Sequence, residues 1–564
     1  MRERVAIVGS GPTALYALQE LIHSKPLLEI TILEASEVAG KGTPYQRGVN
    51  DAAMLSNIPS IEIPTLPSSL VAWLELQDDE YLRSFEIERH GISDRAFYPR
   101  VVIGDYFRDQ FETLLNLGRQ RRHIIHVRER TEVVDVTPVT NMFAVHLNVS
   151  PVKEMFDHMI LATGHSFPSA PESSPGYFDA PWPATALLTV PSGSIGVLGT
   201  SLSAIDAVMA IAARFGQFVR RNDGSLSYRI SDGHEDFRVT MMSRKGLLPE
   251  ADFYFPIPYE NPLICTVDAV SARLALGSRG LLDDVYDLFR QELEHADSEY
   301  ARLIGLEELT VDTFAAAYYG VRDRFDPFVW AESNLAEAKN NYVAKHTVAW
   351  RYAILITHEV IETAVSYFTA DDLSRFNKSF KSIFADDYAT VPHLSIERLL
   401  ALHRADIVNI IALGDQSEVS RGNLSRGATV RFDGGIIEFD TFIDATGQKN
   451  LTADDLPFPT LKSRRVISPA LTATLRGNPR RTGGVSVDEK CRPLIAGIKP
   501  VRKLYFPAVS YLLHKRPFVQ GITSAAELGQ IVARSIIADI MPPIRDKRRK
   551  RRRQRQKPDP LEMI

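Results

Sequence analysis

The chain has 564 residues, more than one hydrophobic core usually organises, so we expect two or three domains. Its apolar content of 45% and charged content of 24% are ordinary for a soluble globular protein. Two cysteines exclude a disulfide framework and a thiolate metal site, and no apolar run approaches the roughly 18 residues that cross a bilayer. We expect a cytoplasmic protein with no metal site and no integral membrane segment.

The net charge of -5 is unevenly distributed along the chain. Residues 543–564 contain 10 Lys and Arg and 3 Asp and Glu, so the rest of the chain is acidic. This basic run has no aromatic residue that would stack on a base. We therefore predict a solvated, disordered tail over 541–564 and no nucleic-acid partner; a contact with anionic lipid or with nucleic acid is the alternative.

The first predicted elements open a doubly wound α/β sheet. Residues 4–9 form a β-branched run that ends in glycines, which is typical of a buried parallel strand. Residues 14–22 have helical apolar spacing, and residues 29–33 predict a second strand that ends at Glu34. The order strand, turn, helix, strand begins a dinucleotide-binding domain.

The turn after the first strand has the form GxGxxA. Gly9 would make the tight turn, Gly11 would let the backbone approach a pyrophosphate, and Ala14 would keep the helix close to the sheet. The helix N-terminus would hold the phosphates, and Glu34 would accept hydrogen bonds from ribose hydroxyls. A glycine-rich turn with no ligand is the alternative. The predicted cofactor-binding residues here are Gly9, Ser10, Gly11, Pro12, Thr13, Ala14 and Glu34.

A degenerate copy of this turn follows a predicted strand at 195–198. It contains Gly199 and Ala204, but Ser201 replaces the middle glycine; serine allows a close approach but does not adopt a positive φ cheaply. The next predicted strand is followed by Arg244 rather than by an acid. A guanidinium suits the 2′-phosphate of NADP, so we favour NADPH over NADH; a surface Arg-Lys pair is the alternative.

The remaining chain is mostly helical from about residue 274 to residue 402, and strands return between 408 and 447. Two strands end in Thr-Gly, at residues 163–164 and 446–447, where a side chain would obstruct a flat ligand or a domain crossover. Residues 249–254 combine two acids with aromatic residues, and either shape a substrate pocket or form an ordinary polar loop. A last helix is predicted from about 523 to 540.

In this order the motifs resemble the FAD-NAD(P)-binding family of flavoproteins with two dinucleotide-binding domains. The matching segments, besides GSGPTA and Glu34, are Gly-Lys-Gly-Thr-Pro-Tyr at 40–45, Met-Leu-Ser-Asn at 54–57, the Pro-Arg segment at 99–107, both Ala-Thr-Gly endings, and 518–525. The resemblance covers nearly the whole chain. It looks closest to a largely uncharacterised bacterial branch, and is more distantly similar to flavin-dependent N-hydroxylating monooxygenases acting on amino acids.

The resemblance implies roles for particular residues. Gly9, Gly11 and Glu34 would bind the adenosine half of FAD, and Tyr45 and Asn57 would lie near the flavin. The helix start at Gln520–Thr523 would lie near the pyrimidine end of the flavin ring. The further cofactor-binding candidates are Arg100, Thr163, Gly164, Gly199, Ser201, Ala204, Arg244, Gly447, Gln520 and Thr523.

We therefore expect an α/β fold with two Rossmann-like dinucleotide-binding domains and a helical insertion. The expected parts are the FAD-binding domain at 1–190 and 410–540, an NAD(P)-binding module at 191–270, a mostly helical insertion at 271–409, and the tail at 541–564.

The expected activity is that of an FAD-dependent oxidoreductase reduced by NAD(P)H. The reduced flavin would either reduce an acceptor or activate dioxygen, as in a monooxygenase acting on a small amine or amino acid. A non-catalytic FAD-binding sensor or scaffold is the alternative. The sequence names no catalytic residue and leaves the oligomeric state open.

Overall fold

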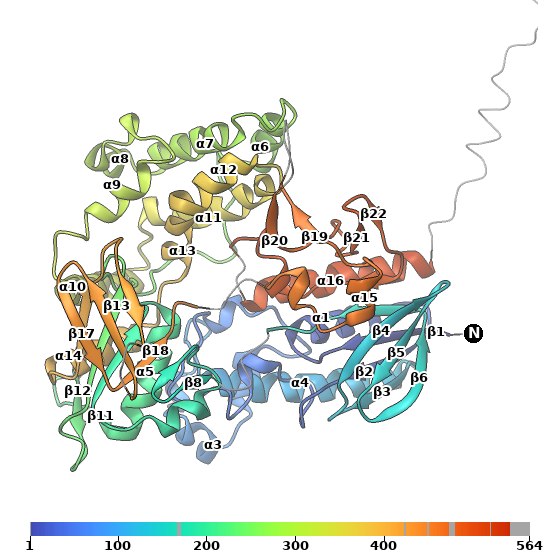
Figure 1. The fold of residues 1–564 in the computed structure, drawn as a ribbon, viewed down its shortest axis with the longest axis horizontal. Coiled ribbons are helices and arrows are strands. Elements are labelled where there is room, and N and C mark those ends of the chain that lie inside the picture. Colours follow the sequence, from blue (N-terminus) through green and yellow to red (C-terminus); the bar gives the residue numbers. More distant parts are fainter. Residues whose placement is uncertain are drawn as a thin grey trace, which may run out of the picture.

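The computed structural model describes residues 2–165, 171–421, 425–447, 451–472, 480–518 and 521–541. Two sheet domains lie side by side, and a helical domain lies above the second of them in the view of Figure 1. This arrangement confirms the predicted fold class, two Rossmann-like domains with a helical insertion. Except for Met541, the predicted basic tail lies outside the described residues.

The first sheet is entirely parallel, in the order β23-β7-β1-β2-β3. Its strands are β1 (Glu3–Val8), β2 (Leu28–Leu33), β3 (Ile124–Arg128), β7 (His158–Leu161) and β23 (Leu504–Tyr505). Side chains alternate between its faces, as the period of two requires: Val5 and Ile7 pack in one core, Ala6 and Val8 in another. Both faces are therefore buried, which explains the unbroken apolar runs of these strands.

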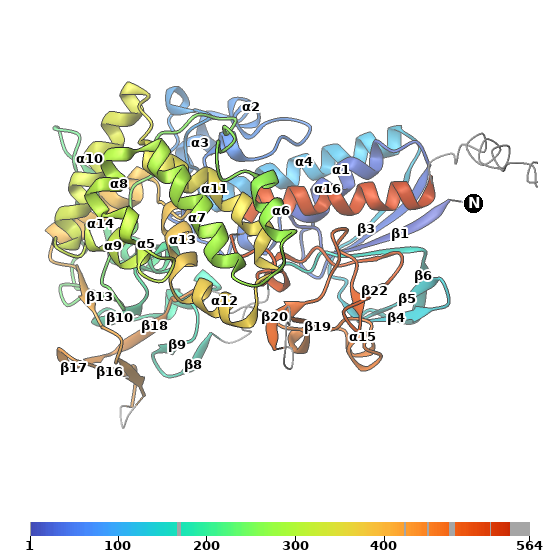
Figure 2. The ribbon, with the colours of Figure 1, turned by 90° about the horizontal axis from the view of Figure 1, so that it is seen from above.

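Three helices cover one face of this sheet, and a small antiparallel sheet covers the other (Figure 2). The helices are α1 (Pro12–Ile22), α4 (Arg100–Gln120) and α16 (Gly521–Ile540); the strands are β4 (Val133–Val139), β5 (Met142–Leu147) and β6 (Ser150–Phe156). In α16, a Cβ added at Gly529 would lie 2.5 Å from the carbonyl oxygen of Thr13. The missing side chain thus lets α16 pack tightly against α1, and the two ends of the chain form one domain.

The second sheet has the order β14-β13-β10-β18-β9-β8, parallel except for the β8–β9 pair. Its elements are β8 (Glu172–Ser174), β9 (Tyr177–Phe178), β10 (Ser194–Leu198), β13 (Arg238–Ser243), β14 (Val408–Ala412) and β18 (Thr441–Asp444), with helices α5 (Leu202–Phe215) and α14 (His393–Arg404). Two smaller sheets accompany it: β11 (Gly216–Arg220) with β12 (Leu226–Ile230), and β15 (Glu418–Ser420), β16 (Ala428–Phe432) and β17 (Gly435–Phe439).

The strands that join the second sheet include some that we expected in the FAD-binding domain, at 1–190 and 410–540. Strands β8, β9, β14 and β18 hydrogen-bond in the second sheet, and the chain rejoins the first sheet only at β23. The physical reason is that buried parallel strands of both sheets are short apolar runs of the same kind. Their residue pattern does not encode which sheet they join.

The middle of the chain folds into a helical domain. Its helices are α6 (Val267–Leu274), α7 (Leu281–Ala296), α8 (Ser298–Ile304), α9 (Phe314–Gly320), α10 (Pro327–Ala344), α11 (Ala349–Val365), α12 (Ala370–Arg375) and α13 (Lys381–Tyr388). Buried phenylalanines fill its core, among them Phe289, Phe314 and Phe380. Phe518, which precedes α16, also lies in this core, so the helical domain holds the segment that leads into the first domain.

The other elements are α2 (Leu70–Glu75) and α3 (Asp79–Ser84), which lie between β2 and α4 along the chain, and α15 (Pro459–Ser463), β19 (Pro469–Leu471), β20 (Arg481–Val485), β21 (Leu494–Ile495) and β22 (Lys499–Pro500), which precede β23. In the part of the chain that the structure describes, no helix is both long and apolar enough to cross a membrane.

Candidate functional site

The turn after β1 requires glycine at Gly9 for two reasons. Its φ is +91°, and an added Cβ would lie 2.3 Å from the carbonyl oxygen of Ala162 at the end of β7. Gly11 differs, because its backbone is extended, with φ −75° and ψ −173°. There an added Cβ would lie 3.2 Å from the Cα of Gly42, so the loop that carries Gly42 lies directly over the turn.

Glu34 lies at the end of β2, buried beside this turn. One of its carboxylate oxygens accepts hydrogen bonds from the Ser10 backbone N–H at 3.0 Å and from the Ser10 hydroxyl at 2.5 Å. The other accepts from the backbone N–H of Ser36 at 2.8 Å. A carboxylate has about four acceptor positions, so one is left for a ribose hydroxyl. The hydroxyl of Ser10 also accepts from the N–H of Gly40, which ties the overlying loop to the turn.

Pro12 and Ala14 of the motif shape the helix and its packing. Pro12 begins α1, where a missing N–H costs nothing, and Ala14 is buried in the core between α1 and the sheet. Gly164 has a φ of +67° and open space where a Cβ would stand, and Thr163 beside it is half-buried. The turn, the helix start and the carboxylate thus fit the adenosine and pyrophosphate half of a dinucleotide.

The second module repeats this geometry with different side chains. Gly199 has a φ of +125°, and its added Cβ would lie 2.7 Å from the carbonyl oxygen of Ala445. Ser201 caps α5 with φ −103°, an extended conformation like that of Gly11. The expected cost of a serine with positive φ therefore does not arise. Ala204 is buried under the turn, and Gly447, with a φ of +106°, is exposed beyond β18.

Ser243 occupies the place in the second sheet that Glu34 has in the first. The N–H of Gly199 bonds to the carbonyl of Met242, as that of Gly9 bonds to Leu33, and in each sheet the next residue faces the turn. The Ser243 hydroxyl accepts a hydrogen bond from Thr200 at 3.1 Å. Arg244 follows, 60% exposed and 3.8 Å from Asp415, which is 85% exposed, so its guanidinium is accessible.

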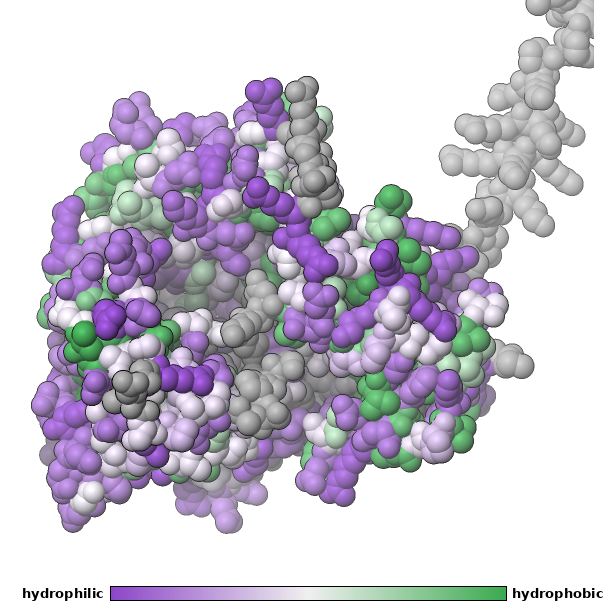
Figure 3. Space-filling view, in the orientation of Figure 1, coloured by the Kyte–Doolittle hydropathy of each residue, from purple (hydrophilic) through white to green (hydrophobic). Residues whose placement is uncertain are grey.

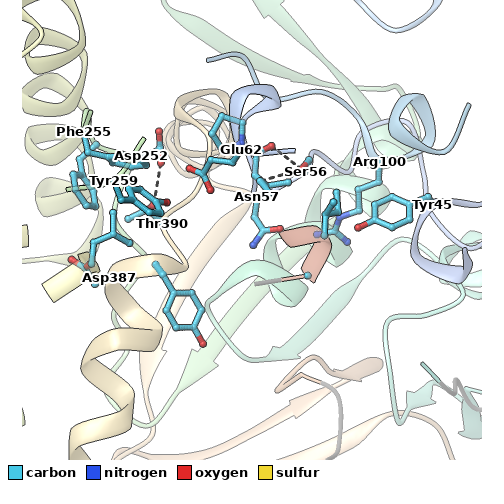
Figure 4. A pocket seen from close by; sticks show the side chains of 17 residues that line it. Tyr45, Ser56, Asn57, Glu62, Arg100, Asp252, Phe255, Tyr259, Asp387 and Thr390 are labelled. Atoms are coloured by element: carbon cyan, nitrogen blue, oxygen red, sulfur yellow. Dashed lines mark hydrogen bonds between the residues drawn. The ribbon is translucent and has the colours of Figure 1, made fainter. Parts of the chain in front are cut away.

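The positions expected near the flavin lie around one cavity of about 100 Å³. Tyr45, Asn57 and Arg100 line one end of it, together with Gly521 and Ile522 at the start of α16 (Figure 4). Gln520 lies outside the described residues, and Thr523 lies half-buried in the first turn of α16. Figure 3 shows that this face of the molecule is hollowed between the helical domain and the two sheets.

The other end of the cavity belongs to the second module and the helical domain. Its lining there is acidic and aromatic: Asp252, Phe253, Phe255, Tyr259, Leu355, Asp387, Tyr388 and Thr390. Glu62, from the loop that follows Asn57, reaches toward Asp252 and Tyr259 (Figure 4). Burial raises the pKa of Glu62 to about 7 and that of Asp252 to about 6, and the charge of Asp252 contributes to the shift of Glu62.

Two buried ion pairs fix the walls of this cavity. Arg100 Nη2 lies 2.7 Å from Asp206 of α5 and so joins the first domain to the second module; burial nevertheless raises the pKa of Asp206 to about 6. Behind Asp252, Glu250 is bonded to Arg351, lies 3.8 Å from Arg322 and accepts from the Trp330 indole at 3.0 Å. Burial opposes ionisation of Glu250, but the two guanidinium groups outweigh it and lower its pKa.

Sequence reasoning found only part of this cavity. The segment 249–254 is one that its acids and aromatic residues allow to shape a substrate pocket, and Asp252 and Phe253 line the cavity. Some lining residues lie in stretches without a motif, and the adjacent acids Asp386 and Asp387 were the one available signal. These residues are Glu62, Tyr259, Asp387, Tyr388 and Thr390. Among the described residues, no group of three or more His, Cys, Asp or Glu side chains is placed to hold a metal ion.

Comparison with known proteins agrees with this geometry. Residues 6–166 match the family model described as FAD-NAD(P)-binding, and residues 266–388 match the YdhS-like middle domain. The chain is 38% identical over 548 residues to "Uncharacterized protein YdhS" of Escherichia coli (strain K12), which covers 97% of this chain and 99% of that protein.

Several solved flavoprotein structures are similar at low identity. The ornithine N-hydroxylase of Kutzneria sp. 744 is 14% identical, covering 96% of this chain and 100% of that chain, with a TM-score of 0.47. The L-lysine 6-monooxygenase of Pseudomonas syringae is 16% identical over 96% and 99%, with a TM-score of 0.44. The bacillithiol disulfide reductase of Staphylococcus aureus is 11% identical over 96% and 99%, with a TM-score of 0.42.

The fold, the glycine turn with its buried carboxylate, and the match over residues 6–166 define an FAD- and NAD(P)-binding protein. The resemblance stated from the motifs is thereby confirmed. Within that class the chain belongs to the YdhS family.

Proposed function

We propose that the chain is an FAD-dependent oxidoreductase that takes electrons from NADPH and uses them on a small molecule in the cavity. The carrying observation is that Tyr45 and Asn57, which the family resemblance implies near the flavin, line one cavity with the cofactor-binding candidate Arg100 and the start of α16. Residues of the second module and the helical domain close the same cavity. A substrate there would lie between the two nucleotide-binding domains, where ligands of such folds are held.

The proposed roles follow from the chemistry of each position. The first turn and the N-terminus of α1 would hold the pyrophosphate of FAD, and Glu34 would hold its ribose. When bound, FAD supplies two-electron chemistry, accepting a hydride equivalent and passing the electrons on. The chain itself orients the reactants and limits the access of water, because buried aromatic side chains such as Phe253 and Phe255 line part of the cavity.

NADPH is the proposed donor because of Ser243 and Arg244. A carboxylate in the place of Ser243 would repel a 2′-phosphate, and the serine hydroxyl does not. The accessible guanidinium of Arg244 would make a charge-assisted, two-pronged contact with that phosphate. Lys245 is the weaker candidate, since its ammonium lies 3.9 Å from the centre of the Tyr319 ring and burial lowers its pKa.

The proposed second half of the reaction is the hydroxylation of a small amine or amino acid with dioxygen. The size of the cavity favours a small substrate, and its acidic lining favours a cationic one. Reduction of another acceptor remains the alternative outcome, and a product assay with and without dioxygen separates the two.

The donor assignment is tested with Arg244→Ala. A charge-assisted contact contributes about 1.5–3 kcal/mol, so the preference for NADPH over NADH in flavin reduction should fall roughly tenfold to hundredfold. Arg431→Ala is the matched control, because Arg431 is 66% exposed and 3.7 Å from Glu418 on the same module. An unchanged ratio in Arg244→Ala, or an equal fall in the control, would place the 2′-phosphate elsewhere.

A further inference from the structure

Glu62 and Asp252 form a pair of carboxyl groups at the end of the cavity away from Tyr45 and Arg100 (Figure 4). Asp252 is 5% exposed, bonded to the Tyr342 hydroxyl and accepting from Thr390 at 3.3 Å. These two hydroxyls hold it in place on the cavity wall. Glu62 comes from a different domain, so the pair spans the boundary between the first domain and the second module.

Within the described part of the chain, no cation lies in direct contact with this pair. Among the described residues, neither Glu62 nor Asp252 has a Lys or Arg nitrogen within 4.0 Å. Arg95 lowers the pKa of both from a greater distance, with its guanidinium stacked over Tyr254.

The other groups facing the pair are neutral or acidic. They are the hydroxyls of Tyr259 and Tyr342, the ring of His393 on the Asp252 carbonyl, and Glu359 near Tyr259. The pair therefore lies in an acidic region that the distant Arg95 compensates only in part.

A third carboxyl in the same cavity has one oxygen without a hydrogen-bond partner. Asp387 is 4% exposed, lines the cavity, and its Oδ2 has no hydrogen-bond partner. Burial raises its pKa, which means that the empty cavity disfavours its charged form. Buried polar atoms are nearly always satisfied in folded proteins, so an orphaned oxygen beside a cavity indicates that a ligand supplies the missing donor.

We propose that Glu62 and Asp252 are the recognition site for the protonated nitrogen of a small amine that carries no carboxylate. An ammonium group offers three N–H donors and one positive charge. It therefore suits two carboxyl groups that both accept hydrogen bonds and that are partly protonated in the protein without a ligand. The inference rests on the proposed function only in calling this ligand the substrate.

The charges of the lining separate an amine from an amino acid. Arg100 is the basic residue among those lining the cavity, and its guanidinium is already paired with Asp206. A ligand carboxylate would find no free cation there and would be repelled by the acidic lining. The cavity thus selects against a zwitterion, which decides between the two substrate classes that the sequence left open.

Recognition of a cation by this pair requires a measurable change in protonation. The ammonium stabilises the ionised carboxyls, so binding should release up to one proton near neutral pH. Affinity should rise by about tenfold from pH 6 to pH 8, as Glu62 loses its proton in the free protein. Asp252→Asn removes the like charge and should move this rise to lower pH.

The test uses the full-length, FAD-loaded protein and titration calorimetry with n-butylamine in two buffers of different ionisation enthalpy. We expect butylamine to bind with proton release, and butan-1-ol and 4-aminobutanoate to bind at least about tenfold more weakly. Glu62→Gln should abolish the proton release and the pH dependence. The matched control is Glu260→Gln, the same change at an exposed residue outside the lining.

Several outcomes would overturn the inference. They are equal binding of butan-1-ol or 4-aminobutanoate, no binding of butylamine, binding without proton release, and unaltered binding by Glu62→Gln. The pH series on the unmodified protein decides the matter even where a variant does not fold. Bleaching of the flavin by NADPH is followed in the same samples. A flavin that NADPH does not bleach would count against the proposed function, whereas amine binding is judged from the calorimetry alone.

Discussion

The two glycines of the turn after β1 are needed for different reasons. Gly9 needs its positive φ and the absence of a side chain, whereas Gly11 has an extended backbone and is needed only for space beside Gly42. Ser201, at the place of Gly11 in the second turn, is exposed and has room for its side chain. The motif predicted where the turns lie. It also implied a positive φ at the position of Gly11 and Ser201, where the structure requires only a small side chain.

This distinction gives a prediction for Gly9→Ala. Gly224 in the β11–β12 hairpin has a similar φ of +83°, but open space around an added Cβ, so Gly224→Ala measures the backbone cost alone. That cost should be about 1–2 kcal/mol. Gly9→Ala should lose about 1–3 kcal/mol more, because its Cβ meets the carbonyl of Ala162, and should lose bound FAD. Urea unfolding and the visible spectrum check this; equal losses in both variants would contradict it.

At the scale of elements, the sequence predicted the strands better than their partners. The strand endings at Gly164 and Gly447 were recognised as similar, but β7 lies in the first sheet and β18 in the second. The local residue pattern indicates which positions are buried and how often apolar residues repeat. Which sheet a strand joins depends on contacts between residues hundreds of positions apart. The same limit hid Glu62 and Asp387, whose partners in the cavity come from other domains.

Glu250 bonds to Trp330 of α10 and to Arg351 of α11, so we expect it to stabilise the packing of these two helices. Glu250→Gln removes the carboxylate bonded to the buried Arg351, whereas Arg322 keeps Asp386 at 2.6 Å; the change should cost about 3–5 kcal/mol. Glu337→Gln removes a 50%-exposed partner 3.9 Å from Arg351 and should cost less than about 1 kcal/mol. Urea unfolding measures both, and similar losses in the two variants would argue against this role of Glu250.

The pH dependence of this effect has a definite sign. The pKa of Glu250 is lowered in the folded protein, so its contribution is present above the unfolded pKa of about 4.3 and is lost as pH falls through the folded value. The stability difference between the unmodified protein and Glu250→Gln should therefore shrink in acid. A difference that grows as pH falls would contradict the assignment.

At the scale of the whole molecule, three domains meet at one cavity. The motifs predicted two Rossmann-like domains with a helical insertion, and the structure confirms that class. What they did not show is that the helical domain forms a wall of the site, through Leu355, Asp387 and Tyr388, and holds Phe518 beside the start of α16. These contacts depend on tertiary packing and leave no periodic signal in the sequence.

The central claim is that electrons from NADPH reach FAD bound in the first domain. Anaerobic mixing of the FAD-loaded protein with NADPH, followed by the visible flavin spectrum, tests it most directly. The account predicts bleaching of the flavin with NADPH, and less efficient bleaching with NADH because Arg244 has no 2′-phosphate to bind. A protein that binds FAD but stays yellow with both donors would contradict the account and favour a non-catalytic, FAD-binding sensor or scaffold.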